Sequence, residues 1–237
     1  MTNELSYLKH KLDSLQVSVT DEQAVRMLEF KELVLEKNKV MNLTAITEAE
    51  KFLNLHIIDS LTALRFIPEN ASVIDIGTGA GFPGVILKIA SPKTQVTLLD
   101  SLKKRTDFLC ESLSKLGITG VEVLNGRAEE FSQKPDLREK FDVSVSRAVA
   151  RLPLLCEYCI PYVKKGGLFV AMKSRSAREE LSLCGNLPSE LGCVVEDVTE
   201  VELPGVDEVR TLILFRKMEN TPQKFPRKNS VLKKLYK

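Results

Sequence analysis

Residues 73–84 read Val-Ile-Asp-Ile-Gly-Thr-Gly-Ala-Gly-Phe-Pro-Gly. A short apolar strand runs into a turn that holds three alternate glycines, Gly77, Gly79 and Gly81. A helix is predicted to begin near Pro83, because the missing N–H of a proline would be unpaired in a first helical turn anyway. Alternate glycines let a ligand lie directly on the backbone, since no Cβ holds it off. Strand, glycine turn and helix together predict a pocket for a nucleotide-like ligand.

The glycine pattern alone fits two ligands. Gly79, Gly81 and Gly84 satisfy the dinucleotide fingerprint G-x-G-x-x-G. Asp75 and the glycines after it satisfy the D-x-G-x-G-x-G pattern of S-adenosylmethionine (SAM) enzymes. Asp75 favours SAM, because a carboxylate here would repel a pyrophosphate and attract the ammonium of the SAM methionine, directly or through water. The structural alternative is that Asp75 only caps the turn.

Asp100 is the second expected anchor. It ends the next apolar strand, residues 95–100, roughly 20 residues past the turn. A carboxylate at this place can accept hydrogen bonds from both ribose hydroxyls of an adenosine. NAD enzymes use the same arrangement, so Asp100 predicts an adenosine-bearing ligand without choosing between the two cofactors. A solvated carboxylate at a strand end is the alternative.

The pattern along the chain predicts an α/β fold. Residues 1–70 read as helical, with cap chemistry at Thr20 and a last segment about Glu48–Phe66. Beyond them, strands near 73–76, 95–100, 121–125, 141–146 and 167–172 alternate with helices near 83–90, 103–116, 152–162 and 177–187, which predicts a parallel sheet with crossover helices. The last two strands, 193–203 and 209–217, are joined by a link too short for a helix and are expected to be antiparallel. That ending is typical of SAM methyltransferases.

The length and the net charge of the chain limit the classes of protein to which it can belong. The 237 residues carry a net charge of only +2 and have an ordinary globular composition. We expect an N-terminal helical extension (1–70), a SAM-binding domain (71–218) and a basic C-terminal tail (219–237). Residues 221–237 contain lysines and arginines but no acid. Contact with nucleic acid and a solvated chain end are both open for this tail.

The five cysteines favour a reduced, cytoplasmic protein, because their number is odd and their spacing shows no disulfide framework. Cys156 and Cys159 look like half a zinc site, but no second pair follows and both histidines are distant in the sequence. We therefore expect two buried thiols and no metal. No segment has the pattern of a signal peptide or the length of a membrane span, so no membrane contact is expected.

Several short motifs resemble, in order and spacing, the bacterial 16S rRNA guanine-N7 methyltransferases, the glucose-inhibited division protein B family. The resemblance covers most of the chain, and its motifs are Asn42-Leu-Thr-Ala-Ile46, His56-Ile-Ile-Asp59-Ser-Leu61, Asp75–Gly84, Leu99-Asp-Ser101 with Lys104-Arg105 and Phe108-Leu109, Gly126-Arg-Ala-Glu129, Ser146-Arg-Ala-Val-Ala150, and Thr221-Pro222 with Pro226-Arg-Lys228. It departs after Lys228, where the Gly-Pro-containing stretch of the family is missing. The placement of the residues that follow is therefore not implied.

The resemblance implies a class I SAM-dependent methyltransferase, a Rossmann-like fold with an N-terminal helical extension. It implies transfer of a methyl group from SAM to N7 of one guanosine in a loop of 16S rRNA near the decoding centre. The partner would be 16S rRNA or the small ribosomal subunit, and we expect a monomer. The cofactor site is predicted at Asp75, Gly77, Gly79, Phe82, Asp100, Ser101, Leu102, Ala128, Glu129 and Arg147. RNA contacts are predicted at Asn42, His56, Asp59, Arg227 and Lys228.

This methyl transfer requires no general base. Guanine N7 has a lone pair and no proton at neutral pH, so methyl transfer depends mainly on proximity and orientation. We expect Arg147 to position the methionine carboxylate or the RNA. Arg127 and Lys173 are expected to neutralise phosphates of the target. Surface salt bridges are the alternative for all three.

His56 and Asp59 lie three residues apart and are expected on one face of a helix. Two roles are open for the pair. They could contact the target or close the cofactor cleft at its rim, and on this reading His56 joins the candidate catalytic set. Alternatively, a local hydrogen bond between them only fixes the helix.

Three other functions stay open. The first is a SAM-dependent methyltransferase acting on another RNA, a protein or a small molecule, although the basic tail argues against a small apolar substrate. The second is an NAD-dependent oxidoreductase, which calorimetry with SAM and NAD would separate from the first. The third is a non-catalytic RNA-binding module, which the intact glycine turn and Asp100 oppose.

Overall fold

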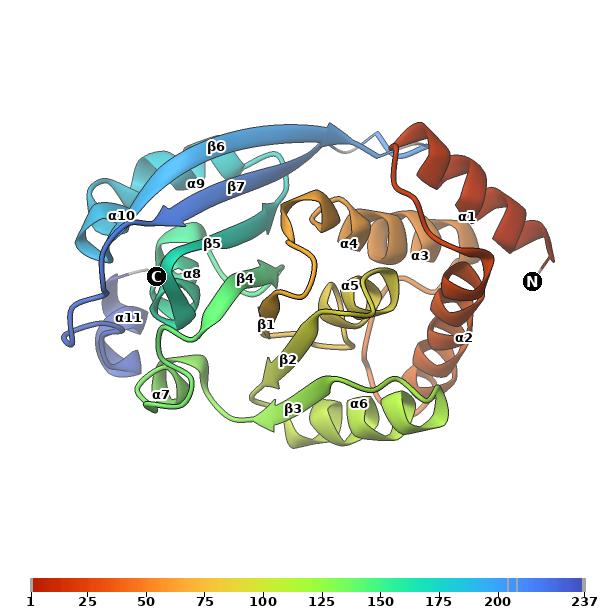
Figure 1. Ribbon diagram of the computed structural model, residues 1–237, viewed down its shortest axis with the longest axis horizontal. Helices are drawn as coiled ribbons and strands as arrows, with labels where there is room; N and C mark the ends of the chain where they lie inside the picture. Colours follow the sequence, from red (N-terminus) through yellow and green to blue (C-terminus); the bar gives the residue numbers. More distant parts are fainter. Residues whose placement is uncertain (1, 204, 208, 236–237) are drawn as a thin grey trace.

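A computed structural model describes residues 2–203, 205–207 and 209–235. A seven-stranded sheet in the order β3-β2-β1-β4-β5-β7-β6 forms its centre (Figure 1). The strands are β1 Ser72–Ile76, β2 Gln95–Asp100, β3 Val121–Asn125, β4 Phe141–Arg147, β5 Val163–Lys173, β6 Cys193–Glu202 and β7 Val209–Lys217. All seven lie where the sequence predicts them.

Strand directions also follow the sequence. β1 pairs in parallel with β2 and with β4, and the parallel pairing continues to β3 on one side and β5 on the other. β7 runs antiparallel to both β5 and β6. The predicted antiparallel ending is confirmed, and the carboxyl ends of β1 to β5 lie at one edge, where open α/β sheets bind ligands.

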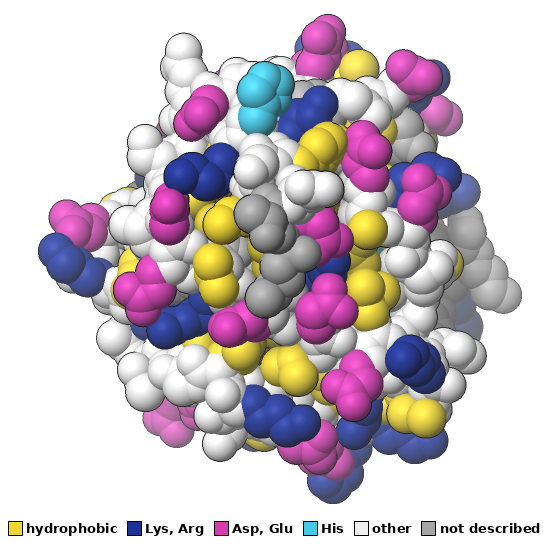
Figure 2. All heavy atoms as spheres, turned by 90° about the vertical axis from the view of Figure 1, so that its right-hand side faces the viewer, with side chains coloured by type: hydrophobic (Ala, Val, Ile, Leu, Met, Phe, Trp, Pro, Cys, Tyr) yellow, Lys and Arg dark blue, Asp and Glu magenta, His cyan; other side chains and the backbone are white. Residues whose placement is uncertain are grey.

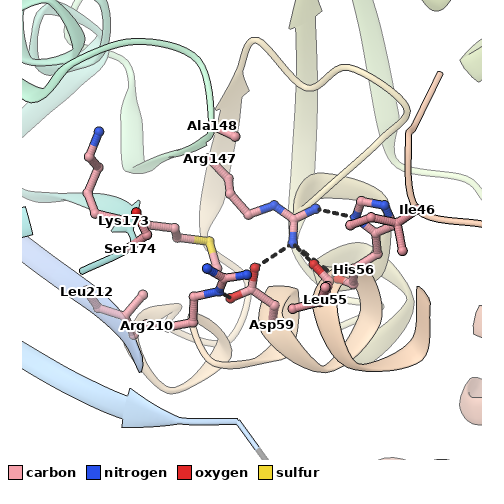
Figure 3. A pocket seen from close by; sticks show the side chains of 11 residues that line it. Ile46, Leu55, His56, Asp59, Arg147, Ala148, Lys173, Ser174, Arg210 and Leu212 are labelled. Atoms are coloured by element: carbon pink, nitrogen blue, oxygen red, sulfur yellow. Dashed lines mark hydrogen bonds and ion pairs between the residues drawn. The ribbon is translucent and has the colours of Figure 1, made fainter. Parts of the chain in front are cut away.

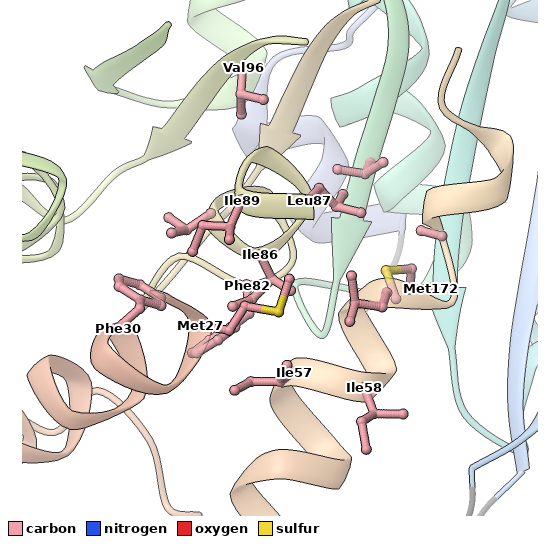
Figure 4. Close-up of a cluster of buried hydrophobic side chains, with 14 of the residues drawn as sticks. Met27, Phe30, Ile57, Ile58, Phe82, Ile86, Leu87, Ile89, Val96 and Met172 are labelled. Carbon is pink, nitrogen blue, oxygen red and sulfur yellow. The ribbon is translucent and has the colours of Figure 1, made fainter. Parts of the chain in front are cut away.

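The sheet is buried on both faces because successive residues of a strand point to opposite sides. In β1, Val73 belongs to one hydrophobic cluster, whereas Ile74 and Ile76 belong to the other. The first cluster is covered by α1 (Thr2–Ser14), α2 (Asp21–Asn38), α5 (Gly84–Ala90) and α6 (Lys103–Lys115), and Figure 4 shows part of it. The second is covered by α8 (Leu152–Cys159), the 3₁₀ turn η3 (Ile160–Tyr162), α9 (Ala177–Cys184) and α10 (Leu187–Glu190).

The N-terminal helices are part of this core. Thr20 caps α2 in a capping box with Gln23, as the cap chemistry predicted. The Gln23 side chain also donates to the carbonyls of Ile89 and Ala90, both at 3.0 Å, which ties α2 to the end of α5. Residues before β1 and residues of the sheet therefore share one continuous hydrophobic cluster.

The segment predicted as one helix over Glu48–Phe66 is divided into four pieces. They are α3 (Ala49–Phe52), a π-helix η1 (Leu53–Ile58), α4 (Asp59–Leu61) and a 3₁₀ turn η2 (Leu64–Phe66). Single π turns within helices occur frequently at functional sites. This one carries His56.

The C-terminal segment is packed on the domain. Thr221, Phe225 and Leu232 are buried, and the last described residues form a helix, α11 (Asn229–Leu235), that the sequence did not predict. Arg138 donates to the carbonyls of Thr221 and Phe225, at 2.8 and 3.0 Å. The part of the basic tail up to Phe225 is thus fixed by buried contacts.

The thiols of Cys156 and Cys159 are buried, as predicted. Within the described ranges, no helix has both the length and the apolarity needed to cross a membrane. The same residues contain no group of three or more His, Cys, Asp or Glu side chains placed to hold a metal ion. The face that includes α1 and α2 carries basic and acidic side chains interspersed, without a continuous basic patch (Figure 2).

Candidate active site

The glycine turn follows β1 and is fixed to the end of β2. The N–H groups of Gly77 and Thr78 both donate to the carbonyl of Leu99, at 2.8 and 3.1 Å. Gly77 and Gly79 have φ angles of +71° and +60°. Residues with a Cβ rarely adopt this conformation, so the path of the turn itself requires glycine.

A cleft of about 320 Å³ opens beside the turn. Most of the predicted cofactor residues line it, namely Gly77, Asp100, Ser101, Leu102, Ala128 and Glu129, and Arg127 joins them. Sequence reasoning missed Arg105, Val149 and Tyr158, which also line the cleft. Its other lining residues are Ile76, Leu99, Gly126 and Ala148. Arg105 belongs to a motif that was noted without a role. Tyr158 reaches the cleft from α8, a placement that only the tertiary fold determines.

Asp100 is held at the centre of the cleft. Its Oδ1 accepts from the N–H of Leu102 at 2.8 Å, and its Oδ2 accepts from the N–H of Gly79 at 3.0 Å. Arg105 Nη1 lies 3.4 Å from Oδ2. Each carboxylate oxygen has two lone pairs, so Oδ1 keeps one for a ribose hydroxyl, and on Oδ2 the second is occupied only by the long contact with Arg105.

Asp75 lies under the turn. Its side chain is completely buried, and Oδ2 accepts from the N–H of Gly84 at 2.8 Å at the start of α5. Burial, as the largest effect, raises the pKa of Asp75 to about 6. Asp75 does not line the cleft, and its contact with Gly84 fits the alternative in which it caps the turn. Contact with the SAM ammonium, directly or through water, stays a prediction.

Phe82 and Gly79 also lie outside the cleft lining, where they support other residues. Phe82 is buried and its ring stacks on the ring of His56, with centroids 4.7 Å apart and an interplanar angle of 10°. Gly79 orients Asp100 through its N–H. Both residues therefore act on the site through the side chains they hold in place.

A second pocket, of about 250 Å³, lies next to the cleft, and Ala148 borders both. Figure 3 shows its lining of cationic, polar and apolar side chains, which comprises Ile46, Leu55, His56, Asp59, Arg147, Ala148, Met172, Lys173, Ser174, Arg210 and Leu212. The predicted residues His56, Asp59, Arg147 and Lys173 are brought together here. A substrate in this pocket would lie beside a cofactor in the cleft.

Arg147, at the end of β4, is held against the π-helix. Nη1 donates to the carbonyl of Leu55 at 2.9 Å and to Asp59 Oδ2 at 2.8 Å (Figure 3). Nη2 faces His56 Nδ1 at 3.2 Å. His56 and Asp59 thus both pair with Arg147 instead of pairing with each other, so the arrangement matches neither predicted role alone. Arg147 lines the second pocket, and the cofactor cleft lining does not include it.

His56 is neutral in this arrangement. An arginine is always protonated, so His56 Nδ1 accepts from Arg147, and the other ring nitrogen, Nε2, carries the proton. Nε2 lies 2.8 Å from the Thr44 hydroxyl, to which it donates. Burial, followed by the charges of Arg147 and Arg210, lowers the pKa of His56 to about 3. With its lone pair occupied, this imidazole is no general base for the pocket.

Two more cationic residues line the second pocket, and the ammonium of one of them, Lys173, points away from Arg147 and His56 (Figure 3). Lys173 Nζ lies 2.6 Å from Glu180 Oε2 and donates to the carbonyl of Ala150 at 3.0 Å. Arg210, at the start of β7, lies with Nε 3.4 Å from Asp59 Oδ1. Sequence reasoning missed Arg210, because only the antiparallel insertion of β7 brings it to the carboxyl ends of the parallel strands.

The remaining predicted RNA contacts lie apart from the second pocket. Asn42 is exposed in the loop between α2 and α3, and Lys228 is exposed before α11. Arg227 is engaged by the buried carboxylate of Glu157, with Nε 2.7 Å from Oε1. This ion pair turns the Arg227 guanidinium toward the interior, which disfavours the predicted RNA contact.

Comparisons with known proteins identify the family. The family model described as rRNA small subunit methyltransferase G matches residues 23–208. The chain belongs to this family. It is 44% identical to a ribosomal RNA small subunit methyltransferase G of Clostridium novyi over 91% of this chain and 90% of that protein. A relative with the same name in Acetivibrio thermocellus is 45% identical, over 90% and 88% of the two chains.

Solved structures of class I methyltransferases confirm the fold of this chain. An O-methyltransferase from Bacillus cereus in complex with SAH superimposes with a TM-score of 0.56 at 17% identity, covering 79% of this chain and 90% of that one. The M. jannaschii TYW2 in complex with AdoMet gives a TM-score of 0.53 at 17% identity, over 68% and 76%. At such identities the likeness concerns the fold alone.

The methyltransferase family and the neighbours with bound AdoMet or SAH give SAM as the cofactor, and the cleft fits it. A Cβ built on Gly77 would meet Val149 Cγ2 at 2.4 Å, so this glycine keeps the backbone bare where the cleft meets the turn. Asp100 offers acceptors for a ribose, and Ala128 and Glu129 line the part of the cleft beyond it. We therefore predict that these residues bind and orient the cofactor, which would supply the methyl group on its sulfonium.

The low pKa of His56 predicts how the free energy of unfolding depends on pH. His56 binds a proton in the unfolded chain below about pH 6.5 but in the folded chain only near pH 3. Between these values the unfolded state holds more protons, so the free energy of unfolding falls as the pH drops, by up to about 1.4 kcal/mol per pH unit. Urea unfolding of the wild type and of His56→Gln from pH 4 to pH 7 measures this difference.

The comparison with His56→Gln is needed because Asp75 acts in the opposite direction. Its raised pKa, about 6, adds stability at low pH that is lost as the pH rises. Both proteins contain Asp75, so its contribution cancels in the difference between their slopes. Parallel pH profiles of the two proteins would show that His56 titrates normally in the folded chain.

Proposed function

We propose that this chain transfers the methyl group of SAM to N7 of a single guanosine in 16S rRNA, near the decoding centre. Membership of the small subunit methyltransferase G family supports rRNA as the substrate. The geometry of the second pocket supports the guanine N7 atom. The observation that carries the proposal is a pocket of fixed donors beside the cofactor cleft, with a histidine that cannot act as a base.

The donors match the edge of a guanine. N7 and O6 lie side by side on that edge and are both acceptors, and arginine is the side chain that most often recognises them. Arg147, Arg210 and Lys173 line the pocket and can donate to O6 or to a neighbouring phosphate. A cationic group on O6 leaves the N7 lone pair to face the methyl group.

The reaction needs no proton transfer at N7. The lone pair of N7 attacks the methyl carbon, the bond from carbon to sulfur breaks, and the electron pair stays on sulfur. The base gains a positive charge while the sulfonium loses its own. The neutral state of His56 is consistent with this chemistry, since an attack by an amino group would produce a proton that a base must remove. Orientation is then the main contribution of the protein to the rate.

Residues further from the pocket are proposed to bind the rest of the RNA. Asn42 and Lys228 are exposed and can reach phosphates, whereas His56 and Asp59 would act through Arg147. Binding by lysines and arginines releases counterions, so the affinity for RNA should fall steeply with salt. We propose that the enzyme acts as a monomer on 16S rRNA or on the small subunit.

The proposal is tested by removing N7 from the substrate. Small subunits or 16S rRNA fragments are made with 7-deazaguanosine or, as a matched control, with inosine, which keeps N7 and O6 but lacks the exocyclic amino group. The natural and inosine substrates should accept labelled methyl groups from SAM, and the 7-deaza substrate should accept none. Methylation of the 7-deaza substrate would assign the activity to another atom or base.

A further inference from the structure

A buried ion pair joins the C-terminal segment to α8. Glu157 is completely buried, and its Oε2 accepts from the N–H of Arg227 at 2.8 Å. Its Oε1 accepts from Arg227 Nε at 2.7 Å and also from Nη2. A carboxylate removed from water requires partners of this kind, so Arg227 fixes the position of α8 relative to the C-terminal segment.

The same segment is fastened to the chain that follows α7 (Ala128–Phe131). The carbonyl of Phe225 accepts from Arg138 Nη1 at 3.0 Å and from Gln133 Nε2 at 3.3 Å. The Phe225 ring is buried against the second hydrophobic cluster. Residues 225–227 therefore connect the chain that directly follows α7 to α8.

These two helices form one wall of the cofactor cleft. Ala128 and Glu129 line the cleft from α7, and Tyr158 lines it from α8, next to Glu157 in the sequence. The Tyr162 hydroxyl donates to the carbonyl of Ala128 at 2.7 Å, which fixes the start of α7 as well. Burial raises the pKa of Tyr158, and Glu129 and Glu157 raise it further, so both carboxylates lie within electrostatic reach of its phenol.

This wall lies at the adenosine end of the cleft. The glycine turn follows β1, Asp100 ends β2, and Ala128 and Glu129 come directly after β3. A cofactor whose ribose binds Asp100 extends its adenine toward β3, away from the turn. Glu129 also borders a surface cavity of about 560 Å³ whose opposite side is formed by Arg227 and Lys228.

We propose that Arg227 is a positioning residue for the cofactor, which holds the α7–α8 wall against the adenosine of SAM through its ion pair with Glu157. The proposal replaces the RNA contact that the sequence suggested for Arg227. It rests on SAM binding and is independent of the target base, so failure of the guanine-N7 proposal would leave it intact.

The test compares Arg227→Met with Lys228→Ala in the full-length protein. Calorimetry gives the Kd for SAM, steady-state kinetics give kcat and the KM for SAM with small subunits, and titration with a 16S rRNA fragment at several salt concentrations gives RNA affinity. In Arg227→Met we expect the Kd and KM for SAM to rise about 3- to 30-fold, the range for changes transmitted through packed neighbours. The kcat at saturating SAM and the RNA affinity should stay within about twofold.

Lys228→Ala is the matched control from the adjacent, exposed position. It should leave the Kd for SAM unchanged, and any effect should appear as weaker RNA binding with a salt slope reduced by about one. The proposal is overturned if Arg227→Met binds SAM like the wild type, or if it weakens RNA binding and leaves SAM affinity intact. Either result would return Arg227 to the RNA surface.

A second variant covers the case in which Arg227→Met does not fold. Arg227→Lys keeps a cation beside Glu157 but lacks the planar guanidinium, whose Nε and Nη2 both donate to the Glu157 carboxylate. It should melt near the wild-type temperature and still show a Kd for SAM raised at least about threefold. A wild-type Kd in Arg227→Lys would overturn the proposal.

Discussion

Replacement of Arg147 by alanine is expected to abolish methylation and to lower the free energy of unfolding by about 3–5 kcal/mol, the cost of removing one partner from a buried ion pair. Asp59 is 4% exposed, and Arg147 Nη1 lies 2.8 Å from its Oδ2. The substitution also leaves the carbonyl of Leu55 and the Nδ1 atom of His56 without their donor. The second pocket loses its shape and one of its charges together.

Urea unfolding and methylation of small subunits measure the two effects. Arg147→Lys is the matched variant, because it keeps the charge but cannot bind Asp59, His56 and a carbonyl with one planar group. We expect it to recover part of the stability and little of the activity. Wild-type SAM affinity and wild-type methylation in Arg147→Ala would show that the role assigned to this pocket is wrong.

Replacement of Asp100 by alanine is expected to weaken SAM binding by about 100-fold or more. Hydrogen bonds to a charged group contribute about 1.5–3 kcal/mol each, and a ribose offers two hydroxyls. The carboxylate also holds the N–H groups of Gly79 and Leu102, so the turn relaxes when it is removed. Calorimetric titration with SAM measures the loss.

Asp107→Ala is the control for this experiment. Asp107 lies on α6, near Asp100 in the sequence, where its exposed carboxylate pairs with Lys103 at 2.8 Å. Removing an exposed ion pair of this kind costs about 1 kcal/mol or less, and the Kd for SAM should not change. If Asp100→Ala and Asp107→Ala bound SAM equally well, Asp100 would not be the ribose anchor.

The parts of this structure that the sequence predicted depend on local patterns. Apolar runs bounded by turns placed all seven strands, and the short link before β7 predicted its antiparallel direction. The glycine turn and Asp100 are set by a strand, a turn and the next strand, which the sequence shows directly. The cofactor half of the site was therefore largely predictable.

The second pocket, where the target would bind, could not be predicted from the sequence, because contacts between distant segments assemble it. Arg147 from β4 and Arg210 from β7 meet at Asp59, and no short motif contains that triplet. The π turn around His56 interrupts the predicted helix, and Arg147 donates to the carbonyls of Leu55 and His56 within this turn. Arg227 could not be assigned for the same reason, since its partner Glu157 lies 70 residues away in the sequence.

The backbone of residues 147–149 links the cofactor cleft to the second pocket. Ala148 borders both pockets and has a φ angle of +56°, which is uncommon for a residue with a Cβ. Next to it, Val149 lies over Gly77 at the floor of the cleft. Residues 147–149 thus place an arginine in one pocket and a valine in the other, so any movement of this segment affects both sites.

The central claim is methylation of one guanine N7 in 16S rRNA, and nucleoside mass spectrometry tests it most directly. The 16S rRNA is digested from cells that carry the gene, from cells that lack it, and from cells complemented with Asp100→Ala. We expect one 7-methylguanosine to be lost in the second and third samples and to return on complementation with the wild type. An identical modification profile in cells with and without the gene would contradict it.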